Sequence, residues 1–191
     1  MLLIEGYDIY RITLPLGRVI GDNNCHYEEM DVLCIVLKTN HGHSGWGYAE
    51  SVWNGTFARD AWYIKQLPSR SQLEIKFEET WWPKLKNQDP NNLEVLRKNF
   101  RSGFPEIDAA VRLAIWDLMA QDKNVPLYKL LNPSTTKIEA LSYGSILDFP
   151  LNDAEAVALT SSFINLGFSI IKVKIGGPDI ARDIARLKLI K

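Results

Sequence analysis

The stretch SIIKVKIGG, residues 169–177, most constrains how this chain can fold. Side chains alternate between the two faces of a strand, which puts three aliphatic side chains on one face and Lys172 and Lys174 on the other. An exposed antiparallel strand that keeps its lysines in water has the same pattern. The neighbouring segments are therefore needed to distinguish a strand with solvent-exposed lysines from a strand whose lysines face an interior site.

The segments around this strand predict alternating strands and helices. We expect a strand at 137–143, a helix at 153–166 capped by Asn152 or Asp153, and a helix from about 179 to 191. A strand between two such helices belongs to a parallel sheet. The aliphatic face then packs on helices, so the two lysines point to the opposite layer or into a closed barrel. Each positive charge disfavours protonation of the other lysine, which favours one of them as a base.

The first fifty residues predict a β-meander. Strands are expected at 2–14, 30–39 and 44–50, with hairpin chemistry at Thr39–Gly42. Gly17–Met30, between the first two strands, is polar and is expected to be a loop. Loops of that length are usually functional or mobile.

Helical spacing of apolar residues follows, at 71–86, 93–101 and 106–121. The last of these has a continuous apolar stripe, with Asp108 and Arg112 expected to pair on its polar side. A turn-rich break at Asn132–Thr135 marks the expected boundary between two domains, 1–135 and 136–191.

Charge and hydropathy exclude several classes of partner. A net charge of −1 with scattered basic residues gives no electrostatic reason to expect nucleic acid or an anionic membrane. With no signal peptide or membrane span in the sequence, we expect a cytoplasmic protein. Cys25 and Cys34 are expected to be reduced thiols. His26, His41 and His43 lack zinc-site spacing, so no metal site is predicted.

Four segments carry a family resemblance. In chain order they are GHSGWGYAE (42–50), IDAAVRLAIWDLMAQDKNVPLYKLL (107–131), KIEALSYGS (137–145) and GFSIIKVKIGG (167–177). Together they resemble the mandelate racemase and muconate lactonizing enzyme family of the enolase superfamily. The resemblance implies an α+β capping domain, a β-meander followed by helices, joined to the start of a (β/α) TIM-like barrel. A complete barrel takes about 250 residues by itself, so we expect an incomplete barrel and a fragment of a longer enzyme.

The resemblance also implies a chemistry, in which a lysine abstracts the proton α to a carboxylate and Mg²⁺ holds the resulting enediolate. Lys174 resembles the general base and Lys172 its electrostatic neighbour, facing the substrate carboxylate. Ser145 matches a position that contacts substrate in some members, and a simple strand-end hydroxyl explains it equally well. Tyr27 and Trp53 are further substrate-binding candidates, because segments 17–30 and 51–56 resemble those that close over the site.

The implied function is that of a racemase, cycloisomerase or acid-sugar dehydratase acting on a small carboxylate such as an acid sugar or hydroxy acid. The family's metal ligands lie on later strands, so we expect Mg²⁺ in the full-length enzyme, no metal site in this chain, and an inactive chain. Family members commonly assemble, which implies a homo-oligomer. The alternative is a noncatalytic truncated paralogue, or a capping-domain module that binds partners through its unfinished barrel edge.

Overall fold

The computed structural model describes residues 1–21, 25–51, 55–57, 67–93, 96, 98, 100–134, 144–146, 152–176 and 179–191. Contacts divide the chain into two units. The first unit comprises residues 1–14, 30–51 and 65–137, and the second comprises 15–29, 52–64 and 138–191. The domain limits 1–135 and 136–191 stay a prediction.

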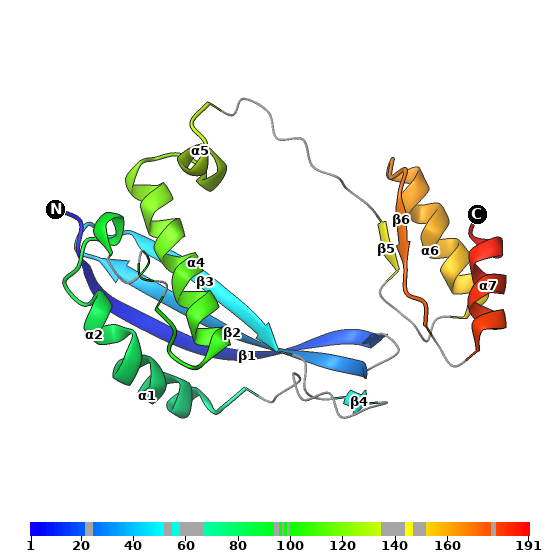
Figure 1. Ribbon diagram of the computed structural model, residues 1–191, viewed down its shortest axis with the longest axis horizontal. Helices are drawn as coiled ribbons and strands as arrows, with labels where there is room; N and C mark the ends of the chain where they lie inside the picture. The colour runs from blue at the N-terminus through cyan, green and yellow to red at the C-terminus, as the bar shows by residue number, and fades with distance from the viewer. Residues whose placement is uncertain are drawn as a thin grey trace. The chain divides into compact units, whose positions relative to one another are not determined.

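An antiparallel sheet confirms the predicted meander (Figure 1). Its strands β1 (Ile4–Gly21), β2 (Cys25–Thr39) and β3 (Ser44–Ser51) lie in that order, and the short β4 (Gly55–Phe57) also pairs with β2. The β2–β3 hairpin closes where the Gly42 N–H donates to the Thr39 carbonyl at 3.0 Å. Gly42 has φ +80°, a left-handed conformation that glycine adopts without strain.

The first two strands are longer than predicted. The expected loop at Gly17–Met30 is wrong, since β1 continues to Gly21 and β2 begins at Cys25. Strand preference depends on pairing partners more than on local composition, and here the two strands pair with each other. Pro15 is tolerated because β1 lies at an edge of the sheet, where one side of the strand has no neighbouring strand to pair with.

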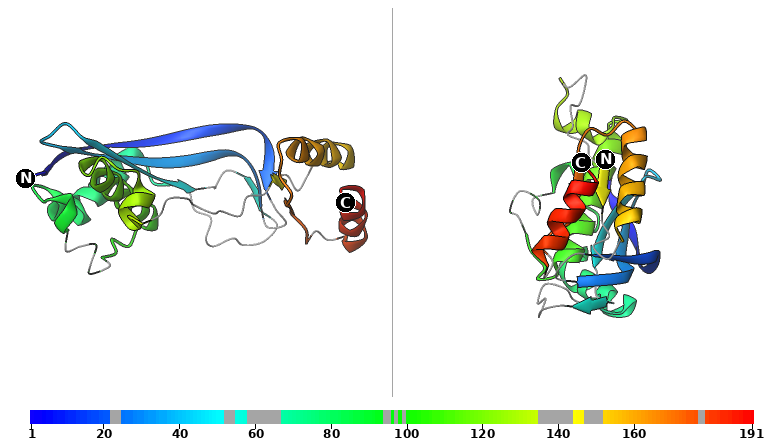
Figure 2. Two further views of the ribbon diagram at one scale, coloured as in Figure 1. Left: turned by 90° about the horizontal axis from the view of Figure 1, so that it is seen from above. Right: turned by 90° about the vertical axis from the view of Figure 1, so that its right-hand side faces the viewer.

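Helices α1 (Arg70–Thr80), α2 (Trp82–Leu85) and α4 (Pro105–Asp122) cover one face of this sheet (Figures 1 and 2). The predicted helix at 71–86 is thus two helices, with Pro83 in the first turn of the second. A 3₁₀ turn (Pro90–Asn92) and α5 (Leu127–Leu131) complete the first unit's helices among the described residues. Most of the predicted helix at 93–101 lies outside the described residues.

The core forms where α4 lies on β3. The predicted stripe of α4 is fully buried at Ile107, Ala110, Val111, Ala114, Ile115 and Leu118. On β3, a Cβ at Gly47 would lie 1.8 Å from the Ala110 carbonyl oxygen, and one at Gly45 would lie 2.2 Å from that of Ala114. The two glycines of the GWG sequence therefore let the helix backbone approach the strand backbone.

Asp108 is not on the polar side of α4, and its expected pairing with Arg112 is wrong. Its buried carboxylate accepts from the Trp81 indole Nε1 at 2.8 Å and from the Ser102 N–H at 3.0 Å. Arg112 instead donates to the Phe100 carbonyl at 2.6 Å. A buried indole N–H requires an acceptor, and Asp108 supplies it.

The second unit contains two βα pairs. They consist of β5 (Gly144–Ile146), α6 (Asp153–Asn165), β6 (Ile171–Val173) and α7 (Ile180–Leu189). The two strands are parallel, which confirms the prediction for the lysine strand, whereas the strand expected at 137–143 lies outside the described residues. Asn152 caps α6 in a reciprocal pair with Glu155. Among the described residues, none of the helices combines the length and apolar character that a bilayer span requires.

Replacing Gly47 with alanine should destabilise the first unit, because the new methyl group would overlap the backbone of α4. We expect a loss of at least about 2 kcal/mol in the free energy of unfolding, measured by urea denaturation with tryptophan fluorescence. Gly6→Ala is the matched control, since a Cβ there meets only Lys38 Cβ at 3.7 Å and Cδ at 3.8 Å. Equal stabilities of the two variants would contradict the packing described for α4.

Candidate active site

Parallel pairing of β5 and β6 places two predicted site residues side by side. The paired residues are Gly144 with Ile171, Ser145 with Lys172, and Ile146 with Val173. Residues paired across neighbouring strands share a face of the sheet. Ser145 and Lys172 therefore occupy the same face.

Helix α6 determines which face that is. A Cβ at Gly144 would lie 2.3 Å from Cγ and 2.7 Å from Cβ of Phe163, so α6 covers the face of β5 to which Gly144 belongs. Figure 1 shows α6 beside β5 and β6. Ile171, the partner of Gly144, shares the covered face. Lys172 therefore lies on the face opposite α6.

The second lysine follows the strand directly. Lys174 lies one residue beyond the end of β6 and is half-buried, whereas Lys172 is exposed. Both lysines take part in interactions within the chain. The structure thus holds two amines near the carboxyl end of a parallel strand, which is the end where α/β folds carry their chemistry.

Two acidic residues missed by the sequence analysis fix the connection after β6. Gly176, with φ +101°, donates its N–H to Asp183 Oδ2 at 2.8 Å. Asp179 caps α7 by accepting the N–H of Ala181 at 2.9 Å and that of Arg182 at 3.2 Å. An aspartate before a helix and another in its first turn are the signals that could have revealed them.

An ion pair ties the two helices of this unit together. Arg186 on α7, only 5% exposed, places Nε 3.2 Å from Asp153 Oδ1 at the start of α6. The guanidinium sits in the last turn of α7 and the carboxylate in the first turn of α6, where each charge is favoured by the helix dipole. This contact fixes α7 against α6.

The structure gives less information on the other predicted site residues. Tyr27 on β2 is half-buried, is paired with Gly55 of β4, and belongs to the same unit as the two lysines. Ser145 is placed by its backbone pairing. Trp53 lies outside the described residues. The structure therefore brings Ser145 and Lys172 together and leaves the substrate contacts of Tyr27 and Trp53 as predictions.

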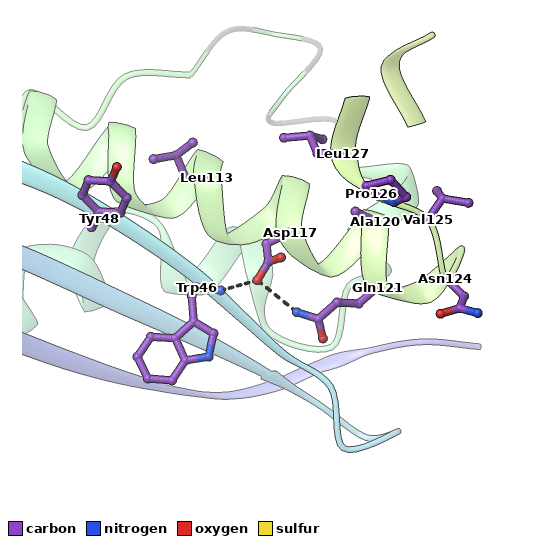
Figure 3. A pocket seen from close by; sticks show the side chains of 10 residues that line it. All are labelled: Trp46, Tyr48, Leu113, Asp117, Ala120, Gln121, Asn124, Val125, Pro126 and Leu127. Carbon is purple, nitrogen blue, oxygen red and sulfur yellow. Dashed lines mark hydrogen bonds between the residues drawn. The ribbon is translucent and has the colours of Figure 1, made fainter. Parts of the chain in front are cut away.

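A pocket of about 520 Å³ in the first unit is a separate candidate (Figure 3). It lies between β3, α4 and α5, and most of its lining is apolar. Its carboxylate, Asp117, already accepts from the Trp46 N–H at 2.9 Å and from Gln121 Nε2 at 3.0 Å. The bond to Trp46 satisfies a backbone N–H of the edge strand β3 and links α4 to that strand. Asp117 therefore stabilises the wall of the pocket.

The part of the chain that the structure describes contains no group of three or more His, Cys, Asp or Glu side chains arranged to hold a metal ion. Asp179 and Asp183, the acidic residues next to the lysine strand, bind backbone N–H groups.

Residues 25–132 match the family model described as mandelate racemase / muconate lactonizing enzyme, N-terminal domain. The chain belongs to this family. The predicted resemblance is thereby confirmed, and it agrees with a capping α+β fold followed by the first βα units of a barrel.

Relatives of this mandelate racemase and muconate lactonizing enzyme family member align along most of its length. It is 26% identical to 3,6-anhydro-alpha-L-galactonate cycloisomerase of Streptomyces coelicolor over 191 residues, which is 96% of this chain and 49% of that protein. It is 30% identical to arabinonate dehydratase of Saccharolobus solfataricus over 176 residues, 85% of this chain and 42% of that protein. The chain spans about half the length of the curated relatives it matches.

A solved structure shows the same fold. L-talarate/galactarate dehydratase from Salmonella typhimurium LT2, liganded with Mg and L-lyxarohydroxamate, superposes with a TM-score of 0.76 at 19% identity. The match covers 99% of this chain and 48% of the dehydratase chain. The chain therefore has a fold that is also found in about half of that dehydratase chain.

Gly144→Ala should loosen α6 from β5, because the added methyl group would overlap Phe163. We expect faster amide hydrogen exchange in α6, measured by mass spectrometry. In a Phe163→Ala background the same glycine substitution should cost less, since most of the overlapping ring is gone. An equal increase in α6 hydrogen exchange in both backgrounds would show that contact with Phe163 is not the reason that position 144 requires glycine.

Proposed function

We propose that this chain supplies the general base of a Mg²⁺-dependent enolase-superfamily enzyme that abstracts the proton α to a carboxylate. Racemases, epimerases, cycloisomerases and dehydratases of this superfamily are among its relatives. The observation that carries the proposal is the position of Lys172 on the strand face opposite α6, with Lys174 two residues further along. Both amines then lie at the carboxyl end of a parallel strand, where a substrate can reach them.

The proposed proton transfer requires a neutral amine on Lys174. Its Nζ lone pair accepts the α-proton, and the electron pair of the broken C–H bond delocalises into the carboxylate to give an enediolate. Lys172 contributes a positive charge that attracts the substrate carboxylate. When bound, Mg²⁺ would supply further stabilisation of the developing negative charge.

The proposed substrate is a small carboxylate such as an acid sugar or hydroxy acid. The names of galactonate cycloisomerase and arabinonate dehydratase support this class, and the dehydratase structure contains an acid-sugar hydroxamate. Ser145, adjacent to Lys172, is the proposed polar contact from β5, and Tyr27 and Trp53 are proposed contacts from the capping segments. We also propose that the protein is cytoplasmic and forms a homo-oligomer. Residues 1–191 alone are proposed to be inactive.

Lys174→Ala should abolish proton exchange at the α-carbon in the longer protein that contains this chain. Exchange is followed by proton NMR in D₂O on a panel of acid sugars and hydroxy acids, and the rate should fall by at least about 10²-fold. Lys76→Ala is the matched control, because Lys76 lies on α1 and pairs with Glu79. Equal exchange rates in the wild type and Lys174→Ala would remove Lys174 from the mechanism.

A noncatalytic partner-binding module is the second candidate function. The observation that favours it is an aliphatic stripe on α7, where Ile180 is 71%, Ile184 48% and Leu187 41% exposed. Positions i, i+4 and i+7 share one face of a helix, so the three form a contiguous apolar surface. Such a surface is typical of a site that binds another protein segment.

Under this second function, residues 1–191 should self-associate through α7 in sedimentation velocity experiments. Ile184→Lys should shift the sedimentation coefficient toward that of a monomer, because it places a charge in the centre of the stripe. Arg182→Ala, a substitution of an exposed side chain on the opposite face of the same helix, should leave association unchanged. A wild-type chain that sediments as a monomer at all concentrations would count against this function.

A further inference from the structure

A carboxylate on α7 holds the backbone that follows the lysine strand. The Gly176 N–H donates to Asp183 Oδ2 at 2.8 Å, across seven residues of the chain. Asp183 lies in the first turn of α7, and Gly176 has φ +101°, which favours glycine. Hydrogen bonds to a charged acceptor are stronger than neutral ones. This bond therefore ties the end of the lysine strand to the helix that follows it.

The connection between β6 and α7 begins at the proposed base. Lys174 directly follows β6 and precedes Gly176 by two residues. On its other side, Val173 is paired with Ile146 of β5. Lys174 therefore lies between two fixed points of the backbone, and the backbone at a residue determines which directions its side chain can take. Release of Gly176 from Asp183 would allow the Lys174 amine to change direction.

Helix α7 is itself held at both ends. Asp179 caps its start by accepting the N–H groups of Ala181 and Arg182. In its last turn, Arg186 pairs with Asp153 of α6 at 3.2 Å. An acceptor on a fixed helix holds the connection in place, whereas an acceptor on a frayed helix would move with it. Asp183 is therefore a firm anchor for Gly176.

A negative charge near the start of a helix also has a simpler explanation. It stabilises the helix by its interaction with the positive end of the helix dipole. That effect requires a charge but no partner outside the helix. Asp183, however, uses one oxygen to bind the backbone N–H of a residue that precedes the helix. This bond distinguishes a group that fixes the connection from one that only stabilises α7.

We propose that Asp183 is a positioning residue for Lys174. By binding the Gly176 N–H it holds the connection after β6, and it thereby keeps the half-buried Lys174 amine in one orientation. The importance of this orientation for proton abstraction rests on the proposed function. The effect of Asp183 on the backbone and on the amine does not, and it can be measured without substrate.

Two substitutions of Asp183 separate the hydrogen bond from the charge. Asp183→Ala and Asp183→Asn both remove the charge, but asparagine keeps an oxygen that can accept from Gly176. Alanine is the better helix former. A role confined to α7 therefore predicts more local opening in Asp183→Asn, whereas positioning predicts more opening in Asp183→Ala. Arg182→Ala, which removes an exposed side chain from the same turn, is the matched control.

Residues 1–191 suffice for the first test. In Asp183→Ala the Gly176 amide should exchange at least about fivefold faster than in the wild type, measured by NMR, because it loses a bond to a charged group. Amides of α6 should keep their rates. Modification by acetic anhydride, read by mass spectrometry, should rise at Lys174 relative to Lys188, an exposed lysine on α7. Asp183→Asn should retain most of the wild-type behaviour in both measurements, and Arg182→Ala all of it.

The longer protein that contains this chain provides the second test. Asp183→Ala should lower kcat for α-proton exchange by about tenfold or more and leave KM within about twofold of the wild type, because the orientation of the base matters in the reaction step. Asp183→Asn should recover most of kcat. A general loss of stability would not be reversed by asparagine, the poorer helix former.

Equal Gly176 exchange in Asp183→Ala and Asp183→Asn would overturn the proposal, as would unchanged modification of Lys174. Faster exchange in α6 as well as at Gly176 would also overturn it, because Asp183 would then act on overall stability. So would a kcat that Asp183→Ala leaves unchanged in a protein that Lys174→Ala inactivates. Retained activity in Lys174→Ala would instead refute the proposed function, and the modification of Lys174 would still decide the role of Asp183.

Discussion

In both units a helix packs closely against a strand at a glycine, through the helix backbone at Gly47 and through the Phe163 side chain at Gly144. Gly47 leaves room for the Ala110 carbonyl of α4, and Gly144 leaves room for Phe163 of α6. A side chain at either position would force the helix away from its strand. Because the helix determines which face of the strand is covered, the contact at Gly144 also places Lys172 on the opposite face. The proposed chemistry depends on that placement.

Buried polar groups hold distant parts of the chain together in a similar way. Asp108 accepts the indole N–H of Trp81, and Asp31 accepts from two residues of β1. Arg186 joins the last turn of α7 to the first turn of α6. Each contact links segments at least 18 residues apart in sequence and satisfies a group that would be costly to bury alone. The apolar contacts form the layers, and these polar contacts fix the register between their elements.

Local periodicity predicted α4, α6 and α7 and the parallel arrangement of β5 and β6, because the spacing of apolar residues reflects which side of an element is buried. It failed at Gly17–Met30, since the lengths of β1 and β2 depend on their mutual pairing and that pairing is not local. It also misassigned Asp108, whose partner Trp81 lies 27 residues away. Strand alternation alone was enough to separate the lysines from the aliphatic residues of β6. The helix that covers one face, and with it the role of Gly144, became evident only from the packing of α6.

The position of the two lysines relative to a substrate is the most direct test of this account. A crystal structure of the longer protein that contains this chain, with a non-reacting hydroxy acid bound, would provide it. We expect Lys174 Nζ within about 3.5 Å of the α-carbon and Lys172 beside the substrate carboxylate. A structure in which both amines turn toward α6, or extend into bulk solvent away from the bound acid, would contradict the proposed role of this strand.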